Sequence, residues 1–223
     1  MKQKVAELFV ILALNPEKGR VAINDVHFRY SLTGAMIMDF LDQGEISIEN
    51  KRIVPHFHNT VNQGHDFLAD KIMKSKKNRR LSFWIKRFSY KNRFFFKSII
   101  DSLEIDRIVS IEQKKFLNII PYNKYWIKDR SVREKLIETL RGVLVYGKEP
   151  GKREIMLLGL VEASRAYPLL ARERGESKLM RKRNSELLKG DIMSSEINEA
   201  IKEVHAAIIS SVAASSAALH GSH

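Results

Sequence analysis

The residues best suited to chemistry gather in one segment, Lys71–Lys97, which reads KIMKSKKNRRLSFWIKRFSYKNRFFFK. Eleven of its residues are Lys or Arg, seven are aromatic and none is acidic. The formal charge of the whole chain is +13 at pH 7, so the excess of positive charge is almost entirely local. A segment of this kind is typical of proteins that bind an anionic partner, which is nucleic acid, an anionic membrane surface or an acidic protein.

Patterns that indicate catalysis or metal binding are weak. His56, His58 and His65 lie close together in the sequence, but a His-x-His step with Asp66 as its one nearby carboxylate is more often incidental than a metal site. The stretch GKEPGK at residues 147–152 lacks the Gly-Lys-Ser/Thr ending of a phosphate loop. The chain has no cysteine and therefore no thiolate nucleophile. We predict a protein that is not an enzyme and that needs no metal or other cofactor.

Length and composition predict one folded domain over residues 1–223, because 44% of the residues are apolar and 29% are charged. No uninterrupted run of eighteen apolar residues occurs, so a transmembrane helix is not expected. Glu7 interrupts the apolar run near the N-terminus, which favours an amphipathic helix over a signal peptide. The absence of cysteine suits a cytoplasmic location.

The spacing of apolar residues predicts a mainly helical protein. Pro16 and Gly44 mark the ends of the first two helices. Ser131 and Glu134 have the spacing of a capping box, and residues 74–80 form a charged linker. The predicted helices cover residues 5–13, 24–43, 66–73, 81–88, 93–103, 131–146, 154–167, 169–188 and 195–218.

Two stretches alternate as β-hairpins do. The first is EISIENKRIVPHFH at residues 45–58, and the second spans about residues 107–127. In the second, the polar run Glu112–Lys115 separates two apolar groups, which places the tip near Ile111–Phe116. The predicted fold is therefore a compact, single-domain helical bundle with two short β-hairpins.

Two interpretations of Lys71–Lys97 are open, and they are compatible. In one, the aromatic residues are core residues of two helices and the cations cover the outer faces; we assign Trp84 to the core on this basis. In the other, the cations and some of the aromatic residues form a binding surface. Phe94, Phe95 and Phe96 cannot all point to one side of a helix, so at least one of them should lie near the surface.

Several stretches occur together in a recognisable order: LALNPEKGR at residues 12–20, SLTGAMIMDFLDQGEI at 31–46, FWIKRFS at 83–89, LGLVEASRAYPLL at 158–170 and EINEAIKEVHAAIISSVAASS at 196–216. Over nearly the whole chain, their order and spacing resemble the Golgi phosphoprotein 3 family. The resemblance implies a helical, non-enzymatic protein that binds peripherally to membranes carrying phosphatidylinositol 4-phosphate. It also implies binding of membrane proteins as cargo.

The resemblance further implies where a headgroup binds. Family members from the Golgi use a tryptophan after the first helix, an arginine in the segment similar to SLTGAM, and two arginines three residues apart before the second hairpin. Asn24, Thr33, Arg93 and Phe96 align with those positions, and only Arg93 keeps its type. Nearby cations can compensate. The residues that we predict to bind the headgroup are Arg29, Arg87, Arg93 and Lys97.

The second hairpin is the other predicted contact. By resemblance, its tip enters the bilayer or pairs with a second copy of the chain; the residues concerned are Ile111, Lys114, Lys115 and Phe116. Alternatively, the hairpin packs its apolar face on the helical core.

These features predict a cytoplasmic protein that associates peripherally with anionic membrane lipid. The expected basic face consists of Lys76, Lys77, Arg79, Arg80, Lys86, Arg87, Arg93 and Lys97. The alternative function is nucleic-acid binding through the same basic and aromatic surface, because bases stack on aromatic rings while cations contact phosphates.

Overall fold

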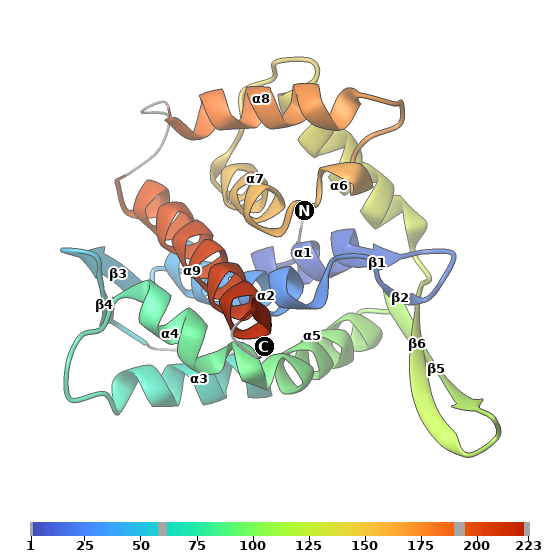
Figure 1. Cartoon of the computed structure of the whole chain (residues 1–223), viewed down its shortest axis with the longest axis horizontal. Coiled ribbons are helices and arrows are strands. Elements are labelled where there is room, and N and C mark those ends of the chain that lie inside the picture. The colour runs from blue at the N-terminus through green and yellow to red at the C-terminus, as the bar shows by residue number, and fades with distance from the viewer. Residues whose placement is uncertain (1, 58–61, 190–194, 221–223) are drawn as a thin grey trace.

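The computed structural model describes residues 2–57, 62–189 and 195–220, and its elements surround one buried helix (Figure 1). This helix, α1 (Val5–Ala13), is buried at every position. A helix that is apolar on all sides is stable only when other elements cover it completely. It ends at Ala13, before Asn15 and Pro16, which confirms the predicted boundary.

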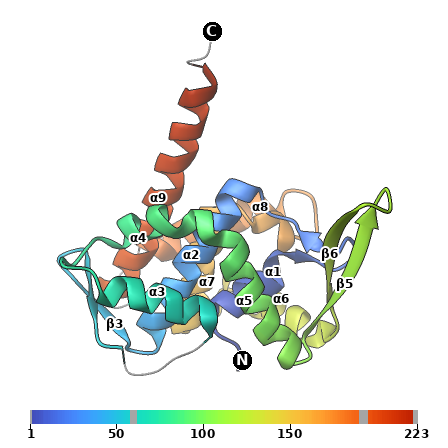
Figure 2. The ribbon, with the colours of Figure 1, turned by 90° about the horizontal axis from the view of Figure 1, so that it is seen from below.

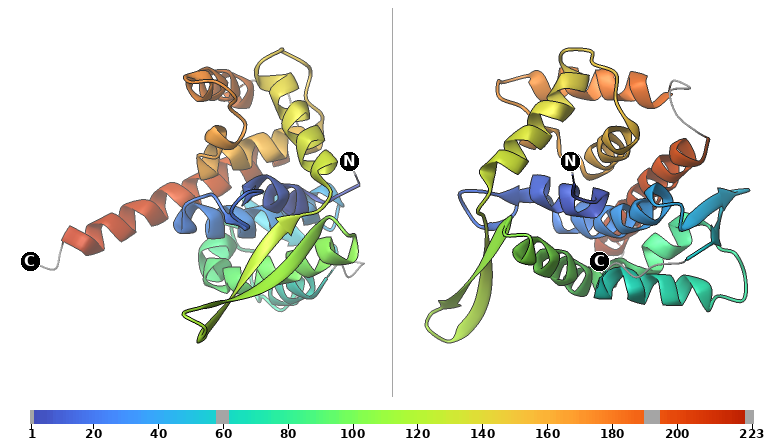
Figure 3. Two further views of the ribbon diagram at one scale, coloured as in Figure 1. Left: turned by 90° about the vertical axis from the view of Figure 1, so that its right-hand side faces the viewer. Right: turned by 180° about the vertical axis from the view of Figure 1, so that it is seen from behind.

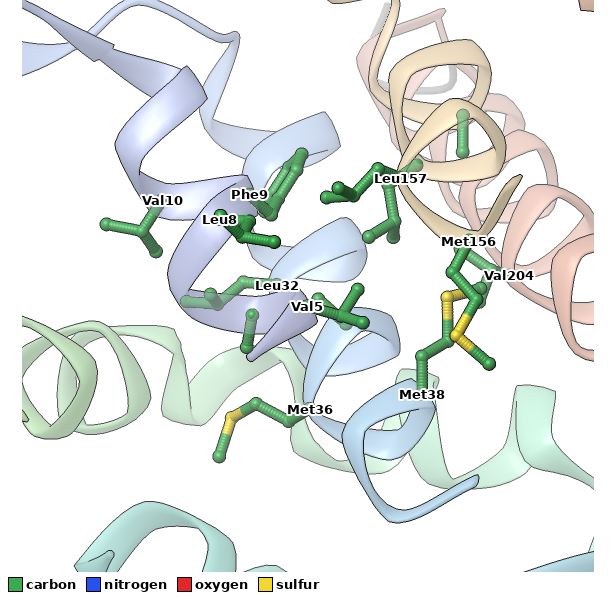
Figure 4. Close-up of a cluster of buried hydrophobic side chains, with 14 of the residues drawn as sticks. Val5, Leu8, Phe9, Val10, Leu32, Met36, Met38, Met156, Leu157 and Val204 are labelled. Carbon is green, nitrogen blue, oxygen red and sulfur yellow. The ribbon is translucent and has the colours of Figure 1, made fainter. Parts of the chain in front are cut away.

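Three helices build the core around α1. α2 (Asp25–Asp42) and α7 (Lys152–Ser164) pack on α1, and α9 (Ser195–His220) crosses both of them. Figure 4 shows Val204 of α9 close to Met38 of α2 and Met156 of α7. A Cβ atom on Gly34 of α2 would lie only 2.8 Å from Val204. The glycine therefore permits the close approach of α9, whose far half extends away from the body of the molecule (Figure 2).

The ends of α2 follow the sequence signals. The side chain of Asn24 caps the helix by accepting the N–H of Val26 at 3.0 Å. At the other end, Gly44 has a φ of +73°, a conformation that glycine adopts without steric cost. The predicted boundaries of this helix are confirmed.

The basic segment Lys71–Lys97 lies on one side of α2. It runs through the end of α3 (Gln63–Met73), through α4 (Leu81–Phe88) and a short 3-10 helix, η1 (Ser89–Lys91), and into α5 (Asn92–Ile105). Figure 1 shows α3 and α5 forming the lower layer of the body, and in Figure 2, seen from below, this layer faces the viewer. α3 begins three residues earlier than predicted, because the side chain of Asn62 caps it by accepting the N–H groups of Gly64 and His65.

Three antiparallel strand pairs complete the described fold. β1 (Leu14–Asn15) pairs with β2 (Arg20–Val21), β3 (Ile46–Glu49) with β4 (Arg52–Pro55), and β5 (Val109–Phe116) with β6 (Ile120–Ile127). The pair β3–β4 confirms the first predicted hairpin. The pair β1–β2 was not predicted, because two residues in each strand are too few to show an alternating pattern.

The second hairpin covers residues 109–127, close to the predicted span, but its first strand is longer than the sequence suggested. Glu112 pairs with Lys124 inside the ladder, and the turn lies at Leu117 and Asn118, which have φ values of +49° and +59°. The prediction of a tip at Ile111–Phe116 is therefore wrong, except that Phe116 adjoins the turn. The polar run that resembled a turn is a stretch of strand with solvent on both faces.

The remaining helices differ from prediction at their starts. α6 (Arg130–Leu144) begins at the cap residue Asp129, whose carboxylate accepts the N–H of Ser131, so Ser131 is not the cap. The helix predicted over residues 169–188 is wrong in its first part: a short 3-10 helix, η2 (Tyr167–Leu169), precedes a break, and α8 (Glu176–Lys189) follows. Arg141 stabilises the break by donating to the carbonyl of Leu170 and to both carboxylate oxygens of Glu176.

The mainly helical class is confirmed. Within the described residues, every helix is too short or too polar to span a lipid bilayer.

Candidate functional site

The basic segment has an aromatic inner face and a cationic outer face. Trp84 is 4% exposed, which confirms its assignment to the core. Phe94 is 37% exposed while Phe95 is fully buried, so the three consecutive phenylalanines divide as predicted. Phe83 is 38% exposed and therefore belongs to the surface. The interpretation as core residues is confirmed for Trp84, Phe88 and Phe95, whereas Phe83, Tyr90 and Phe94 lie at the surface.

The linker before α4 is held in place. The N–H of Ile53 in β4 donates to the carbonyl of Arg79 at 2.9 Å, and the guanidinium of Arg52 donates to the carbonyl of Asn78 at 2.8 Å. A β-bridge also joins Arg52 to Arg80. The predicted charged linker thus runs along the edge of the β3–β4 hairpin, and this pairing fixes the backbone that carries Arg79.

A hollow of about 370 Å³ lies between α3, the linker and α4, and we call it the α3–α4 hollow. Its lining residues are Lys71, Lys74, Ser75, Arg79, Phe83, Trp84, Arg87 and Phe88. A neighbouring depression shares Phe83 and Arg87 and adds Lys86 and Tyr90. Cations and aromatic rings therefore alternate along one continuous surface.

Two kinds of contact arrange the cations of the α3–α4 hollow. Lys74 and Lys71 approach Asp70 at 2.5 Å and 3.3 Å, and hydrogen bonds from Lys74 first and then Lys71 lower the pKa of that carboxyl. The guanidinium of Arg79 lies 5.1 Å from the centre of the Phe83 ring. The guanidinium of Arg87 lies 5.9 Å from the centre of the Phe88 ring. Such cation–π contacts restrict the positions of the two arginines.

A second hollow, of about 320 Å³, lies between the β2–α2 connection and α5, and we call it the Arg93 hollow. Its lining residues are Val21, Ile23, Asp25, Phe28, Asn92, Arg93 and Phe96. Among these residues, one cation, Arg93, is matched by one carboxylate, Asp25. This wall therefore carries no excess of positive charge.

The four predicted headgroup residues do not line one hollow. Arg87 lines the α3–α4 hollow and Arg93 lines the other. Arg29 lies beside the Arg93 hollow, with its Nε 3.9 Å from the Asp25 carboxylate. Lys97 is on the exposed face of α5, where a hydrogen bond to Asp101 at 2.6 Å raises the pKa of its ammonium group. Two of the four cations are therefore engaged by carboxylates of their own helix.

The other positions aligned with the headgroup site have structural roles. Thr33 is fully buried, and its hydroxyl donates to the carbonyl of Arg29 at 3.1 Å. Asn24 is the cap of α2. Phe96 packs edge-on against Phe28 and Tyr125, with ring centres 5.6 Å and 5.0 Å apart.

The end of the β5–β6 hairpin is an apolar knob. We define the hairpin tip as residues 116–120, in which Phe116 is 60% exposed, Leu117 75% and Ile119 79%. Phe116 was predicted from the sequence, whereas Leu117 and Ile119 were not. The signal that indicates them is a run of apolar residues, 116–120, that only Asn118 interrupts at the turn.

The other predicted hairpin residues lie below the tip. Ile111 is partly buried and packs against the core, where it pairs with Tyr125. Lys114 contacts Glu112 at 2.6 Å, and this hydrogen bond raises the pKa of the lysine. Lys115 pairs with Pro121 and is exposed, so it can reach a ligand near the tip.

The base of the hairpin is anchored to the body. The N–H of Tyr125 donates to the carbonyl of Gly19 at 2.8 Å. Gly19 has a φ of +62°, and a Cβ atom there would lie 3.3 Å from the Trp126 ring. The glycine permits this close contact between the β1–β2 turn and β6.

The histidines do not converge on one another. The Nε2 of His56 lies 3.0 Å from the hydroxyl of Ser47, and His58 is outside the described residues. The Nε2 of His65 lies 2.9 Å from the carboxylate of Asp39, and both residues are 1% exposed. Asp39 also accepts the N–H of Val5 at 2.7 Å, so this buried pair caps α1. In the part of the chain that the structure describes, no three His, Cys, Asp or Glu side chains are grouped to hold a metal ion.

A sequence model of the family described as Golgi phosphoprotein 3 (GPP34) matches residues 5–204. The chain belongs to the Golgi phosphoprotein 3 family. The matched region runs from the start of α1 into α9, and it includes both hollows and the whole β5–β6 hairpin. Comparison with curated protein sequences found no match. The sites described above are thus parts of the Golgi phosphoprotein 3 domain and not additions to it.

Proposed function

We propose that this protein binds peripherally to membranes by contacting anionic phospholipid headgroups and by inserting the hairpin tip. The headgroups are contacted through its basic side, which is the surface of α3, α4 and α5 that carries the basic segment. The observation that carries the proposal is that both features lie on one side of the molecule. Figures 1 and 3 show the β5–β6 hairpin extending beyond the layer formed by α3 and α5. A membrane surface contacts both when the hairpin leans toward the layer of α3 and α5.

The basic side retains uncompensated charge. Within the described residues, Lys71, Lys74 and Lys97 of the basic segment form ion pairs. The exposed cations of the segment for which no ion pair is found there are Lys76, Lys77, Arg79, Arg80, Lys86, Arg87 and Arg93. Each Lys or Arg close to an anionic leaflet contributes about 1 kcal/mol of attraction. Several of them acting together are enough to concentrate the protein at such a membrane.

The hairpin tip supplies the second contribution. Exposed apolar side chains lower the free energy of a protein when they move from water into the interfacial region of a bilayer. Attachment through one lipid-like anchor is marginal, and an anchor combined with a polybasic patch is stable. The tip and the basic side form such a combination.

The resemblance to Golgi family members favours phosphatidylinositol 4-phosphate as the headgroup. This finer assignment rests on Arg93, which keeps the residue type of the aligned position, and on Arg29 beside it. We further propose that the protein is cytoplasmic and not an enzyme. A second copy of the chain meeting the hairpin and a membrane-protein cargo are the partners that the resemblance favours.

Vesicle co-sedimentation at physiological ionic strength tests the proposal. Neutral vesicles are compared with vesicles carrying phosphatidylglycerol or phosphatidylinositol 4-phosphate at matched charge. We expect binding to both anionic kinds and stronger binding to the phosphoinositide. Equal binding to the two anionic kinds would restrict the proposal to a general basic platform. Absence of binding to any vesicle would contradict the proposal.

Charge variants locate the surface. The triple change Arg87→Ala, Arg93→Ala and Lys97→Ala should weaken vesicle binding. The binding that remains should also depend less on salt concentration, because fewer charges contribute to it. The matched control removes the same charge from α8, on the opposite side of the body in Figure 1, through Lys178→Ala, Lys182→Ala and Arg183→Ala. Equal losses in both variants would show that net charge, and not this surface, determines attachment.

Nucleic acid is the second candidate, favoured by exposed aromatic rings beside the cations. Tyr90 is 64% exposed, and the ammonium of Lys91 lies 5.4 Å from the centre of its ring. Such pairs contact single strands by stacking and charge. Gel-shift titration with single-stranded RNA and DNA decides between the candidates, because tight binding there combined with no vesicle binding would favour nucleic acid.

A further inference from the structure

The two hollows of the basic side differ in charge. The Arg93 hollow is lined by one cation, Arg93, and one carboxylate, Asp25, and Arg29 pairs with Asp25 from outside the lining, which leaves an excess of one positive charge. The α3–α4 hollow is lined by four cations and by no carboxylate; its cations are Lys71, Lys74, Arg79 and Arg87. Asp70 bonds to the two lysines from outside the lining and offsets one charge. An anion is therefore attracted to the α3–α4 hollow more strongly than to the hollow that the family alignment indicates.

We propose that the α3–α4 hollow is a binding site for a phosphomonoester group, separate from the Arg93 hollow. The inference rests on the proposed function, because it names the chemical class that the basic side recognises. A phosphomonoester carries between one and a half and two negative charges near pH 7 and offers three acceptor oxygens. A phosphodiester carries one charge. A site with a net excess of several cations favours the monoester.

The two arginines are positioned for phosphate before it arrives. The backbone of Arg79 is fixed by its hydrogen bond with β4, and its guanidinium lies on the Phe83 ring. Arg87 is placed similarly against Phe88. A guanidinium that uses its flat face on a ring keeps its N–H edge free to donate two parallel hydrogen bonds to a phosphate. Less side-chain entropy is then lost when the anion binds.

A buried donor in the same wall lacks an acceptor. Trp84 lines the α3–α4 hollow and is 4% exposed, and its Nε1–H has no hydrogen-bond partner among the described residues. A buried donor without an acceptor is costly, so most such donors in native proteins are satisfied. The indole of Trp84 forms part of this wall, so an anion in the hollow changes its surroundings. The surrounding rings, Phe83 and Phe88, suit the organic part of a phosphate ester.

Tryptophan fluorescence reports occupancy directly. The chain contains two tryptophans, Trp84 and Trp126, so a Trp126→Phe background isolates the signal of Trp84. The probes are inorganic phosphate, glycerol 3-phosphate as a soluble monoester, and glycerophosphoglycerol as a soluble diester. We expect glycerol 3-phosphate and phosphate to change the Trp84 emission at concentrations at which the diester does not.

Variants assign the response to the hollow. Arg79→Gln with Arg87→Gln should weaken binding of the monoester on the order of thirtyfold, from the loss of two contacting charges. The control Arg174→Gln with Arg183→Gln removes two exposed arginines near α8 and should leave the affinity unchanged. An unchanged affinity in the Arg79 and Arg87 variant, or an equal loss in the Arg174 and Arg183 control, would overturn the proposal.

Vesicles separate a lipid source from a free phosphate compound. Phosphatidic acid, a monoester lipid, is compared with phosphatidylglycerol at matched charge. Preference for phosphatidic acid that disappears with Arg79→Gln and Arg87→Gln supports a lipid ligand. Equal binding to both lipids with no response to soluble monoesters refutes the inference while leaving membrane attachment intact. A Trp84 response to soluble monoesters without vesicle binding supports the site in the hollow and refutes the proposed function. A Trp84 response to single-stranded nucleic acid but not to monoesters refutes the inference.

Discussion

Two regions of the molecule break the rule that apolar groups lie inside and polar groups outside, and they do so in opposite ways. Asp39 and His65 are polar and buried, and each nitrogen and oxygen shown for them has a partner. The hairpin tip is apolar, and its side chains Phe116, Leu117 and Ile119 are 60%, 75% and 79% exposed. A buried polar group whose hydrogen bonds are all made maintains the fold, whereas an exposed apolar group indicates a surface that a partner covers. The predictions below test this distinction through stability.

The largest loss of stability is expected from Asp39→Ala. This change removes the carboxylate that the N–H groups of Val5 and Ala6 and the buried Nε2 of His65 contact. Removing one member of a buried pair costs about 3–5 kcal/mol. Urea unfolding measures the change, and Asp25→Ala at the exposed start of the same helix is the control. A loss no greater than that of the control would mean that the pair contributes little.

A smaller loss is expected from Asn184→Ala. The buried Nδ2 of Asn184 donates to the carbonyl of Leu158 at 2.9 Å and to the hydroxyl of Tyr167 at 2.6 Å, while its Oδ1 has no hydrogen-bond partner in the described part of the chain. A hydrogen-bonding group in such a position contributes about 1–3 kcal/mol when its partner would be left unsatisfied. The exposed neighbour Arg183→Ala is the control in the same unfolding experiment, and stability equal to the control would contradict the assignment.

Acid should remove the contribution of Glu176. Hydrogen bonds from Arg141, above all, and from the backbone of Arg172 lower the pKa of Glu176 from 4.5 to about 2 in the folded protein. The carboxylate is favoured in the folded state, so its stabilisation is complete above pH 4.5 and is lost as the pH falls toward about 2. The difference in Tm between the natural protein and Glu176→Gln should therefore narrow over that range. A constant difference would show that the carboxylate charge is not involved.

The smallest effect on stability is expected at the hairpin tip. Phe116→Asp alters a side chain that is 60% exposed. Substitutions at such surface positions usually change the free energy of unfolding by less than about 0.5 kcal/mol. The same change should weaken vesicle binding, because it removes apolar surface and adds a negative charge. Loss of the thermal transition would instead make Phe116 a structural residue, and unchanged vesicle binding would remove the tip from the membrane contact.

Sequence patterns predicted the elements whose signals are local. Asn24, Gly44 and Pro16 act on the backbone within a few residues of themselves, and the boundaries that they mark are correct. The break before α8 could not be predicted in this way, because Arg141, a residue of α6, holds both of its ends. Asp39, which caps α1 from α2, is also far in sequence from the N–H of Val5 that it accepts.

The candidate site shows the same limit. Composition located the basic segment, but the grouping of its cations depends on how α3 and α4 meet and on the pairing of Arg79 with β4. The length of β5 was misjudged for another reason. Beyond Ile111 the strand has no buried face, and without burial there is no selection for alternating apolar residues.

The contact between Gly19 and Tyr125 fixes the base of the hairpin to the body, and under the proposed membrane attachment it limits how far the body lies from the lipid. Five strand residues separate the anchored pair Ile111–Tyr125 from Phe116, a rise of about 17 Å at ~3.3 Å per residue. Electrostatic attraction at physiological salt decays over about 8 Å. A hairpin perpendicular to the membrane would hold the cations near its base about two Debye lengths from the lipid, too far for strong attraction. The hairpin must therefore lean if the tip and the cations are to contact the membrane together. In the proposed attachment, the contact between Gly19 and Tyr125 would therefore set the tilt of the whole molecule relative to the membrane.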